Sequence, residues 1–107
     1  MSPPYRIFQP TTRILSSTSA PDLLHWVSAT LDVGIRLLLI DLRYVMFMDS
    51  SGLGALVIAR NRVDKQGGTL AVCSLSGQTR MLMETADVHT IVDIYDDPID
   101  FQNSVLK

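Results

Sequence analysis

Cysteine is almost missing from this chain. Cys73 is the single cysteine among 107 residues, so no internal disulfide can form. No apolar run reaches the length that crosses a membrane. The start, Met1-Ser2-Pro3-Pro4, lacks a charged flank followed by an apolar stretch, so we expect no signal peptide. These absences favour a cytoplasmic protein, kept in a reducing environment and with no contact to a membrane.

Charge is also scarce, and it is evenly divided. Nine basic and eleven acidic residues give a formal net charge of −2 at pH 7. The basic residues do not cluster, so sequence-independent attraction to phosphate backbones has little to rest on. We therefore expect no direct binding to nucleic acid.

Signatures of catalysis and of cofactor binding are missing as well. His25 and His89 are isolated, and with one cysteine they cannot form a structural zinc site. The nucleophile elbow Gly-x-Ser-x-Gly is absent, and so is the phosphate-binding Gly-Lys-Ser/Thr loop. Gly52-x-Gly54 lacks the rest of a dinucleotide fingerprint. The sequence therefore predicts no catalytic residues, no metal and no cofactor, and we expect a protein that is not an enzyme.

What the chain does have is enough apolar material for a core. Hydrophobic residues make up 47% of it and charged residues 19%, the balance of a globular protein. A chain of 107 residues has the size of one domain and can bury a core without disulfides or metals. We expect one domain over residues 1–107, with a core over about 5–106.

Strand and helix patterns alternate along the sequence. The expected strands cover residues 5–9, 36–42, 69–73 and 90–95. The expected helices run from Pro21-Asp22 to Gly34, with Ser19 or Ala20 as the cap, and over 52–65, 78–85 and 98–105. Residues 11–15 either continue the sheet or only plug its edge. The alternation predicts an α/β fold, with a mostly parallel sheet covered by helices.

The most informative stretch is Phe47-Met48-Asp49-Ser50-Ser51-Gly52-Leu53-Gly54-Ala55-Leu56. A strand ends, two hydroxyls follow an acid, and a helix is expected to begin at Gly52. Ser50 and Ser51 would then lie on a turn beside a helix N-terminus, where amide donors and the helix dipole favour anions and polar partners. Either Asp49 and Ser50 merely cap the helix, or Ser50 is a recognition or phosphorylation site.

Together with Ile40-Asp41-Leu42 and Gly67-Gly68-Thr69-Leu70, this stretch resembles STAS domains, a family named for sulfate transporters and anti-sigma factor antagonists. The resemblance runs from about residue 7 to about residue 101, and its most specific part is Asp-Ser-Ser-Gly-Leu-Gly. The free-standing form looks like a bacterial anti-sigma factor antagonist. The resemblance implies a four- or five-stranded sheet with helices and no catalysis, and Asp41 is interpreted as structural.

The resemblance also implies a partner switch. Such an antagonist binds an anti-sigma factor that is also a serine protein kinase, and this binding releases the sigma factor. The kinase phosphorylates the serine after the motif aspartate, which corresponds to Ser50, and a PP2C-type phosphatase reverses the modification. The implied partner-binding residues are Asp49, Ser50, Ser51, Gly52, Leu53, Gly54 and Ser16. A monomer is expected for a free-standing domain.

One segment departs from the family pattern. Where the family usually has Gly-x-Leu-Asp, this chain has Arg13-Ile14-Leu15-Ser16, so Ser16 stands in place of the acid and Arg13 in place of the glycine. The acid of the family helps to form the partner or kinase surface. Its replacement therefore bears on which partner is bound and on whether Ser50 is phosphorylated. Arg13 is either solvated or attracts an anion near Ser50.

A second function stays open beside the switch. The chain could be a non-switching STAS scaffold that binds a protein partner, an anion or a nucleotide through the loop 49–54. Gly52 and Gly54 could then serve close packing alone, or they could keep the surface low for a partner. Ser50 separates the two functions, since a switch loses partner binding when Asp replaces Ser50 and a scaffold does not.

Overall fold

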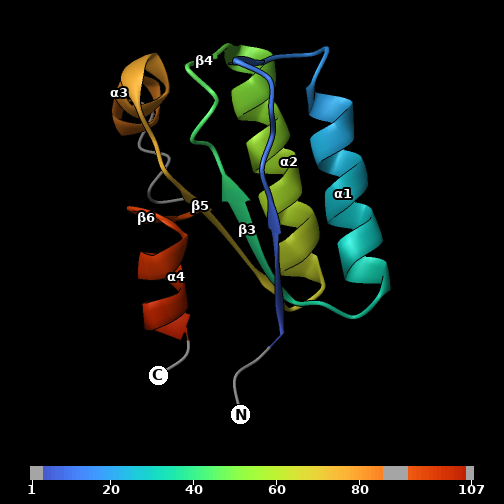
Figure 1. Cartoon of the computed structure of the whole chain (residues 1–107). Coiled ribbons are helices and arrows are strands. Elements are labelled where there is room, and N and C mark those ends of the chain that lie inside the picture. Colours follow the sequence, from blue (N-terminus) through green and yellow to red (C-terminus); the bar gives the residue numbers. More distant parts are fainter. Residues whose placement is uncertain (1–3, 86–91, 106–107) are drawn as a thin grey trace.

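The computed structural model describes residues 4–85 and 92–105, and its strands and helices alternate along most of the chain (Figure 1). In chain order the elements are β1 (Tyr5–Phe8), β2 (Ile14–Leu15), α1 (Ala20–Asp32), β3 (Leu37–Asp41), β4 (Phe47–Met48), α2 (Ser50–Lys65), β5 (Thr69–Cys73), α3 (Gly77–Thr85), β6 (Asp93–Tyr95) and α4 (Pro98–Val105). The predicted α/β class is therefore confirmed.

The strands form two parallel sheets. The larger one has four strands in the order β1-β3-β5-β6, and every described pair in it is parallel. The smaller one pairs β2 with β4, so that Ile14 lies opposite Phe47 and Leu15 opposite Met48. The open question about residues 11–15 is thus answered, because this segment forms a strand that stays outside the main sheet.

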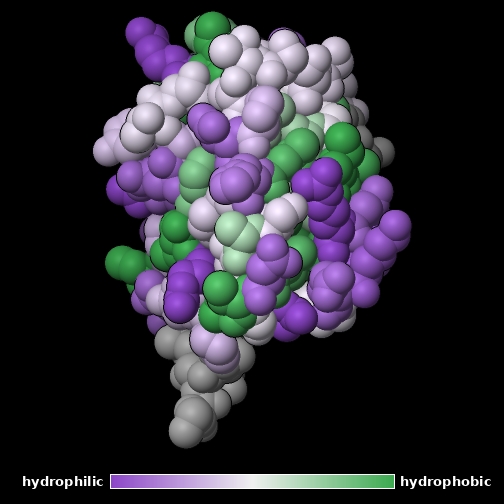
Figure 2. Space-filling view, turned by 90° about the vertical axis from the view of Figure 1, so that its right-hand side faces the viewer, coloured by the Kyte–Doolittle hydropathy of each residue, from purple (hydrophilic) through white to green (hydrophobic). Residues whose placement is uncertain are grey.

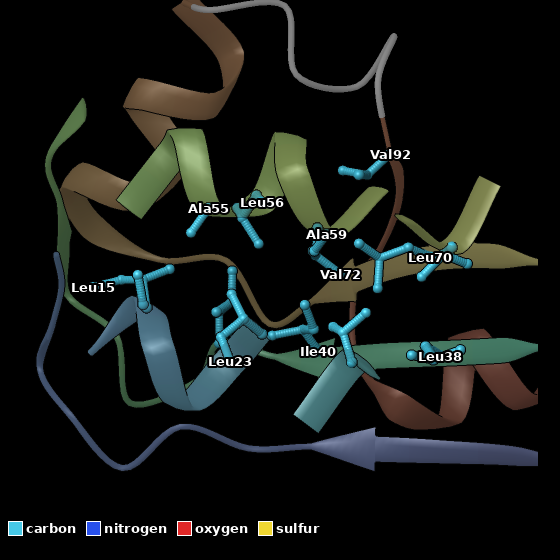
Figure 3. Close-up of a cluster of buried hydrophobic side chains, with 14 of the residues drawn as sticks. Leu15, Leu23, Leu38, Ile40, Ala55, Leu56, Ala59, Leu70, Val72 and Val92 are labelled. Atoms are coloured by element: carbon cyan, nitrogen blue, oxygen red, sulfur yellow. The ribbon is translucent and has the colours of Figure 1, made fainter. Parts of the chain in front are cut away.

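Helices cover both faces of the main sheet (Figure 1). On one face, α1 and α2 pack over alternate residues of the central strands, such as Leu38 and Ile40 (Figure 3). On the other face, Phe101 of α4 is fully buried against Leu39, Ala71 and Cys73. Because β3 is covered on both sides, its sequence is a continuous apolar run rather than an alternating one.

Several predicted boundaries differ from the observed ones. The helix expected to begin at Gly52 begins at Ser50, since Asp49 is its N-cap and accepts a hydrogen bond from the Gly52 N–H at 2.9 Å. Ser19 is the N-cap residue of α1, as one of the two alternatives predicted, although its hydroxyl donates to the Ile14 carbonyl and makes no capping hydrogen bond. The strand expected over 90–95 is observed as Asp93–Tyr95, and residues 90 and 91 lie outside the described part.

The apolar spacing of the sequence predicts an inner face of α2 made of Leu53, Leu56, Val57 and Val63, and the structure differs from it in part. Leu56 and Val63 are buried, as expected, whereas Leu53 and Val57 are only partly buried. The remaining buried positions are small residues, namely Gly52, Ala55 and Ala59. Small residues on this face let α2 approach the rest of the protein closely.

Gly52 marks the tightest approach in the structure around α2. A Cβ atom at this position would overlap the Leu15 carbonyl group and lie 2.9 Å from the Met48 side chain. The Asp49 N–H also donates to the Leu15 carbonyl, at 3.3 Å. The first turn of α2 therefore rests directly on the backbone of β2. At Gly54, by contrast, a Cβ atom would meet nothing within 4 Å.

Asp41 ties the end of β3 to its surroundings. It is 1% exposed, and it accepts hydrogen bonds from the Gln9 side chain at 3.0 Å and from the Arg43 N–H and Nε at 3.1 and 2.9 Å. Burial raises the pKa of this carboxyl, but the bonds from Gln9, Ser74 and Arg43 and the Arg43 charge outweigh it and lower the pKa below its usual value. The contacts agree with the structural role expected for Asp41.

The two glycines of the motif should respond in opposite ways to alanine. Gly52→Ala should lower the free energy of unfolding by about 1–3 kcal/mol, because the added methyl group collides with the Leu15 backbone. Gly54→Ala should raise it by about 0.5–1 kcal/mol, because alanine is the better helix residue and the space is open. Urea unfolding measures both, and equal stability of the two variants would contradict the close packing.

Asp41 should make stability depend on pH. Its pKa is lowered in the folded protein from an unfolded value of about 3.9, so its stabilisation is present at neutral pH and is lost as the pH falls through the folded pKa. Asp41→Asn should cost about 1–3 kcal/mol at pH 7 and progressively less below about pH 4. Urea unfolding of both proteins between pH 7 and pH 3 tests this, and a constant difference between them would contradict it.

Candidate functional site

The starts of α1 and α2 and the ends of β2 and β4 meet at one end of the molecule, the upper end in Figure 1. Ser50 and Ser51 occupy the first turn of α2 there, and both are exposed. In a first helical turn the backbone N–H groups have no acceptor within the helix. Two exposed hydroxyls thus lie at the positive end of a 16-residue helix.

Asp49 provides the cap, which separates its role from that of the two serines. Its Oδ1 accepts the Gly52 N–H, and its carbonyl accepts the Leu53 N–H at 3.0 Å. A carboxylate at this place also interacts favourably with the positive end of the helix dipole. The capping alternative is therefore confirmed for Asp49, whereas Ser50 lies in the first turn of the helix and does not cap it. The two hydroxyls remain at the surface.

Ser16 lies beside this turn, because it follows the Leu15 carbonyl that faces Gly52. Its own N–H donates to the Ser19 hydroxyl at 3.0 Å, and its carbonyl accepts the Ala20 N–H at 2.8 Å. Ser16 thus shapes the start of α1. The structure brings this predicted residue next to the motif, although a serine there supplies no negative charge.

The remaining predicted residues differ in how far they are buried. Leu53 is half-buried and packs against the main core cluster. Gly52 is buried at the contact with β2, whereas Gly54 is half-exposed with open space above it. Close packing therefore explains why position 52 is a glycine. At position 54 no packing requires a glycine, and its lack of a side chain keeps the surface low. The side chain of Arg13 is exposed, and its carbonyl accepts the N–H groups of Met46 and Phe47.

Apolar surface flanks the serines on two sides. On one side, Ile14 and Phe47 are paired across β2 and β4, and each is about half exposed, at 51% and 50%. On the other side, a shallow groove of about 400 Å³ runs between the outer faces of α1 and α2. Its lining residues are Ser17, Ala20, Pro21, Leu24, Ser51, Gly54, Ala55 and Ile58.

The sequence did not indicate this groove. Ser51 and Gly54 were predicted site residues, whereas Leu24 and Ile58 were not among them. The available signal was the apolar Ile58 on an otherwise polar side of α2, which is 46% exposed. In the view onto the α1 side, the upper end is mostly pale, the colour of intermediate hydropathy, and purple hydrophilic residues gather lower down (Figure 2).

Other candidate groups do not converge on a site. Among the described residues, no group of three His, Cys, Asp or Glu side chains could hold a metal ion. None of the described helices is long and apolar enough to cross a membrane. His25 is exposed on α1, and His89 lies outside the described residues. Burial raises the pKa of Cys73 to about 11, so its thiol stays protonated at neutral pH.

Known proteins match both the sequence and the fold. The chain is 31% identical over 62 residues to an anti-sigma F factor antagonist of Paenibacillus polymyxa. The aligned stretch covers 58% of this chain and 53% of that relative. The match thus spans about half the length of the relative.

Two crystal structures share the fold. A proposed anti-sigma factor antagonist from Thermotoga maritima aligns with a TM-score of 0.81 at 22% identity, over 94% of this chain and 88% of that one. An anti-sigma factor antagonist from Mycobacterium paratuberculosis aligns with a TM-score of 0.82 at 21% identity, over 96% and 86%. The STAS domain family matches residues 6–103, nearly the whole sequence, and the chain therefore belongs to the STAS domain family.

Proposed function

We propose that this chain is an anti-sigma factor antagonist. It binds an anti-sigma factor that is also a serine protein kinase, and a sigma factor is thereby released. The kinase phosphorylates Ser50, which ends the complex, and a PP2C-type phosphatase restores it. The protein acts in the cytoplasm as a monomer and catalyses no reaction. The observation that carries this proposal is the exposed Ser50 in a helical turn that Asp49 has already capped.

The partner surface in this proposal is the end of the molecule around the first turn of α2. Asp49, Ser50, Ser51 and Gly54 supply its exposed or half-exposed part, while Gly52 and Leu53 hold it in place from below. Ser16 borders it at the start of α1. The printed names of the relatives from Paenibacillus polymyxa and Mycobacterium paratuberculosis support an anti-sigma factor as the partner.

A phosphate on Ser50 would act through charge. It adds about −1.5 to −2 charges beside the Asp49 carboxylate and within a surface where serines and apolar residues predominate. A partner packed on this surface would have to remove water from the phosphate, which is costly. In the free protein the N-terminus of α2 stabilises the same phosphate. The modified protein thus stays folded while its complex is weakened.

A non-switching STAS scaffold is the alternative function, with a protein, an anion or a nucleotide bound through residues 49–54. The observation in its favour is Ser16, which supplies a hydroxyl where the family usually has an acid. If a kinase needs this acid in order to recognise its substrate, the chain would bind a partner without being phosphorylated.

Intact-mass analysis tests the switch directly. The chain is incubated with ATP and with each purified anti-sigma factor kinase encoded in the same genome. We expect one added phosphate on the wild type and on Ser51→Ala, and none on Ser50→Ala. We also expect Ser50→Glu to weaken binding to that kinase by at least about tenfold, because it places a charge beside Asp49.

Two results would contradict the switch. A phosphate that is still added to Ser50→Ala would show that a different residue is modified. Stable binding of a kinase without any phosphorylation, unchanged in Ser50→Glu, would favour the scaffold instead. Circular dichroism of each variant shows whether the fold is retained.

A further inference from the structure

The groove between α1 and α2 is open because small residues form its floor. Ala20 and Ala55 have the shortest side chains possible at these places, and Gly54 has none. A Cβ atom on Gly54 would meet nothing within 4 Å, so no local packing requires a glycine there. Helix propensity disfavours glycine in such a position by about 0.5–1 kcal/mol relative to alanine. The glycine thus costs stability and leaves space at the surface.

The walls of the groove are apolar and uncharged. Leu24 of α1 and Ile58 of α2 are its largest side chains, and Ile58 is 46% exposed to solvent. None of the eight lining residues carries a charge. Such walls complement aliphatic or aromatic side chains, since a charged group placed there would lose water without gaining a partner.

The groove is continuous with the serine site. Ser51 belongs to its lining and is the next residue after Ser50, and Gly54 follows one helical turn further along the same face. Ser50 is exposed and does not belong to the lining, but its neighbour Ser51 does. A partner that binds over both serines therefore also covers the end of the groove.

We infer that the groove receives an apolar segment of the same anti-sigma factor kinase that acts on Ser50. This inference rests on the proposed function and adds to it the place where affinity arises. Burial of apolar side chains in the groove holds the unmodified complex together. Phosphorylation of Ser50, which precedes the lining residue Ser51, then decides through its charge whether the complex persists. A second copy of this chain in the groove would cover Ser51 and compete with the kinase for this surface.

A pair of matched variants tests the groove. Ile58→Glu places a charge in it, and Ile99→Glu makes the same change on α4, on the other face of the sheet, at a residue that is 66% exposed. Affinity for the purified kinase is measured by titration with a non-hydrolysable ATP analogue, so that Ser50 stays unmodified. We expect Ile58→Glu to weaken binding by at least about tenfold and Ile99→Glu to change it by less than about twofold.

A third variant separates blocked binding from damaged folding. Gly54→Leu fills the groove without adding charge, at a position where the space is open and the helix gains a better residue. We expect it to weaken binding by at least about tenfold as well, while its urea midpoint is equal to or higher than that of the wild type.

The possible outcomes distinguish a failure of the groove inference from a failure of the proposed function. If the wild type binds a kinase and both groove variants bind it equally well, the groove inference is overturned and the proposed function stands. If the wild type binds no kinase of the genome, both are overturned. Sedimentation that shows a wild-type dimer, dissolved by Ile58→Glu, would assign the groove to a second copy and overturn the inference.

Discussion

The contact between Gly52 and the backbone of Leu15 is the constraint on which the site depends. With any side chain at position 52, the first turn of α2 could not rest on β2. This contact places an exposed pair of serines beside the start of α1, and it brings Gly54 and Ile58 alongside Leu24. The absence of a side chain at Gly52 thus lets the small sheet, both helices and the candidate functional surface pack together. The requirement is steric, which is why it leaves little trace in composition or charge.

The residues that stabilise the fold are different from those that form the exposed serine surface. The main sheet is closed by apolar layers on both faces, and Asp41 fastens the end of its central strand through three hydrogen bonds. The serine surface contributes little to that core, since its hydroxyls are exposed and its cap is made by Asp49. Under the proposed function, a charge added to Ser50 would therefore alter recognition while the packed layers remain unchanged. This separation is what a reversible surface switch requires.

Much of the fold was predictable from the sequence, because long periodic segments such as 36–42 and 69–73 carry clear patterns. The strand Ile14–Leu15 was left open, since two residues show no period and their partner lies more than thirty positions away. The start of α2 was placed two residues late because Gly52 was interpreted as a beginning, although Asp49 carried the signal of a cap. Ser50 and Ser51, which the structure exposes, were singled out through their motif. The groove was not, because it arises only where two helices pack.

Amide hydrogen exchange of the whole chain, with and without the proposed anti-sigma factor kinase, tests most directly whether this end of the molecule is the partner surface. Slower exchange is predicted in the first turns of α1 and α2, where Ala20 and Ser51 line the groove, with unchanged exchange in α4. Slower exchange confined to α4 and β6, with the turn at Ser50 and Ser51 unaffected, would contradict the placement of the partner and with it the role of the serine site.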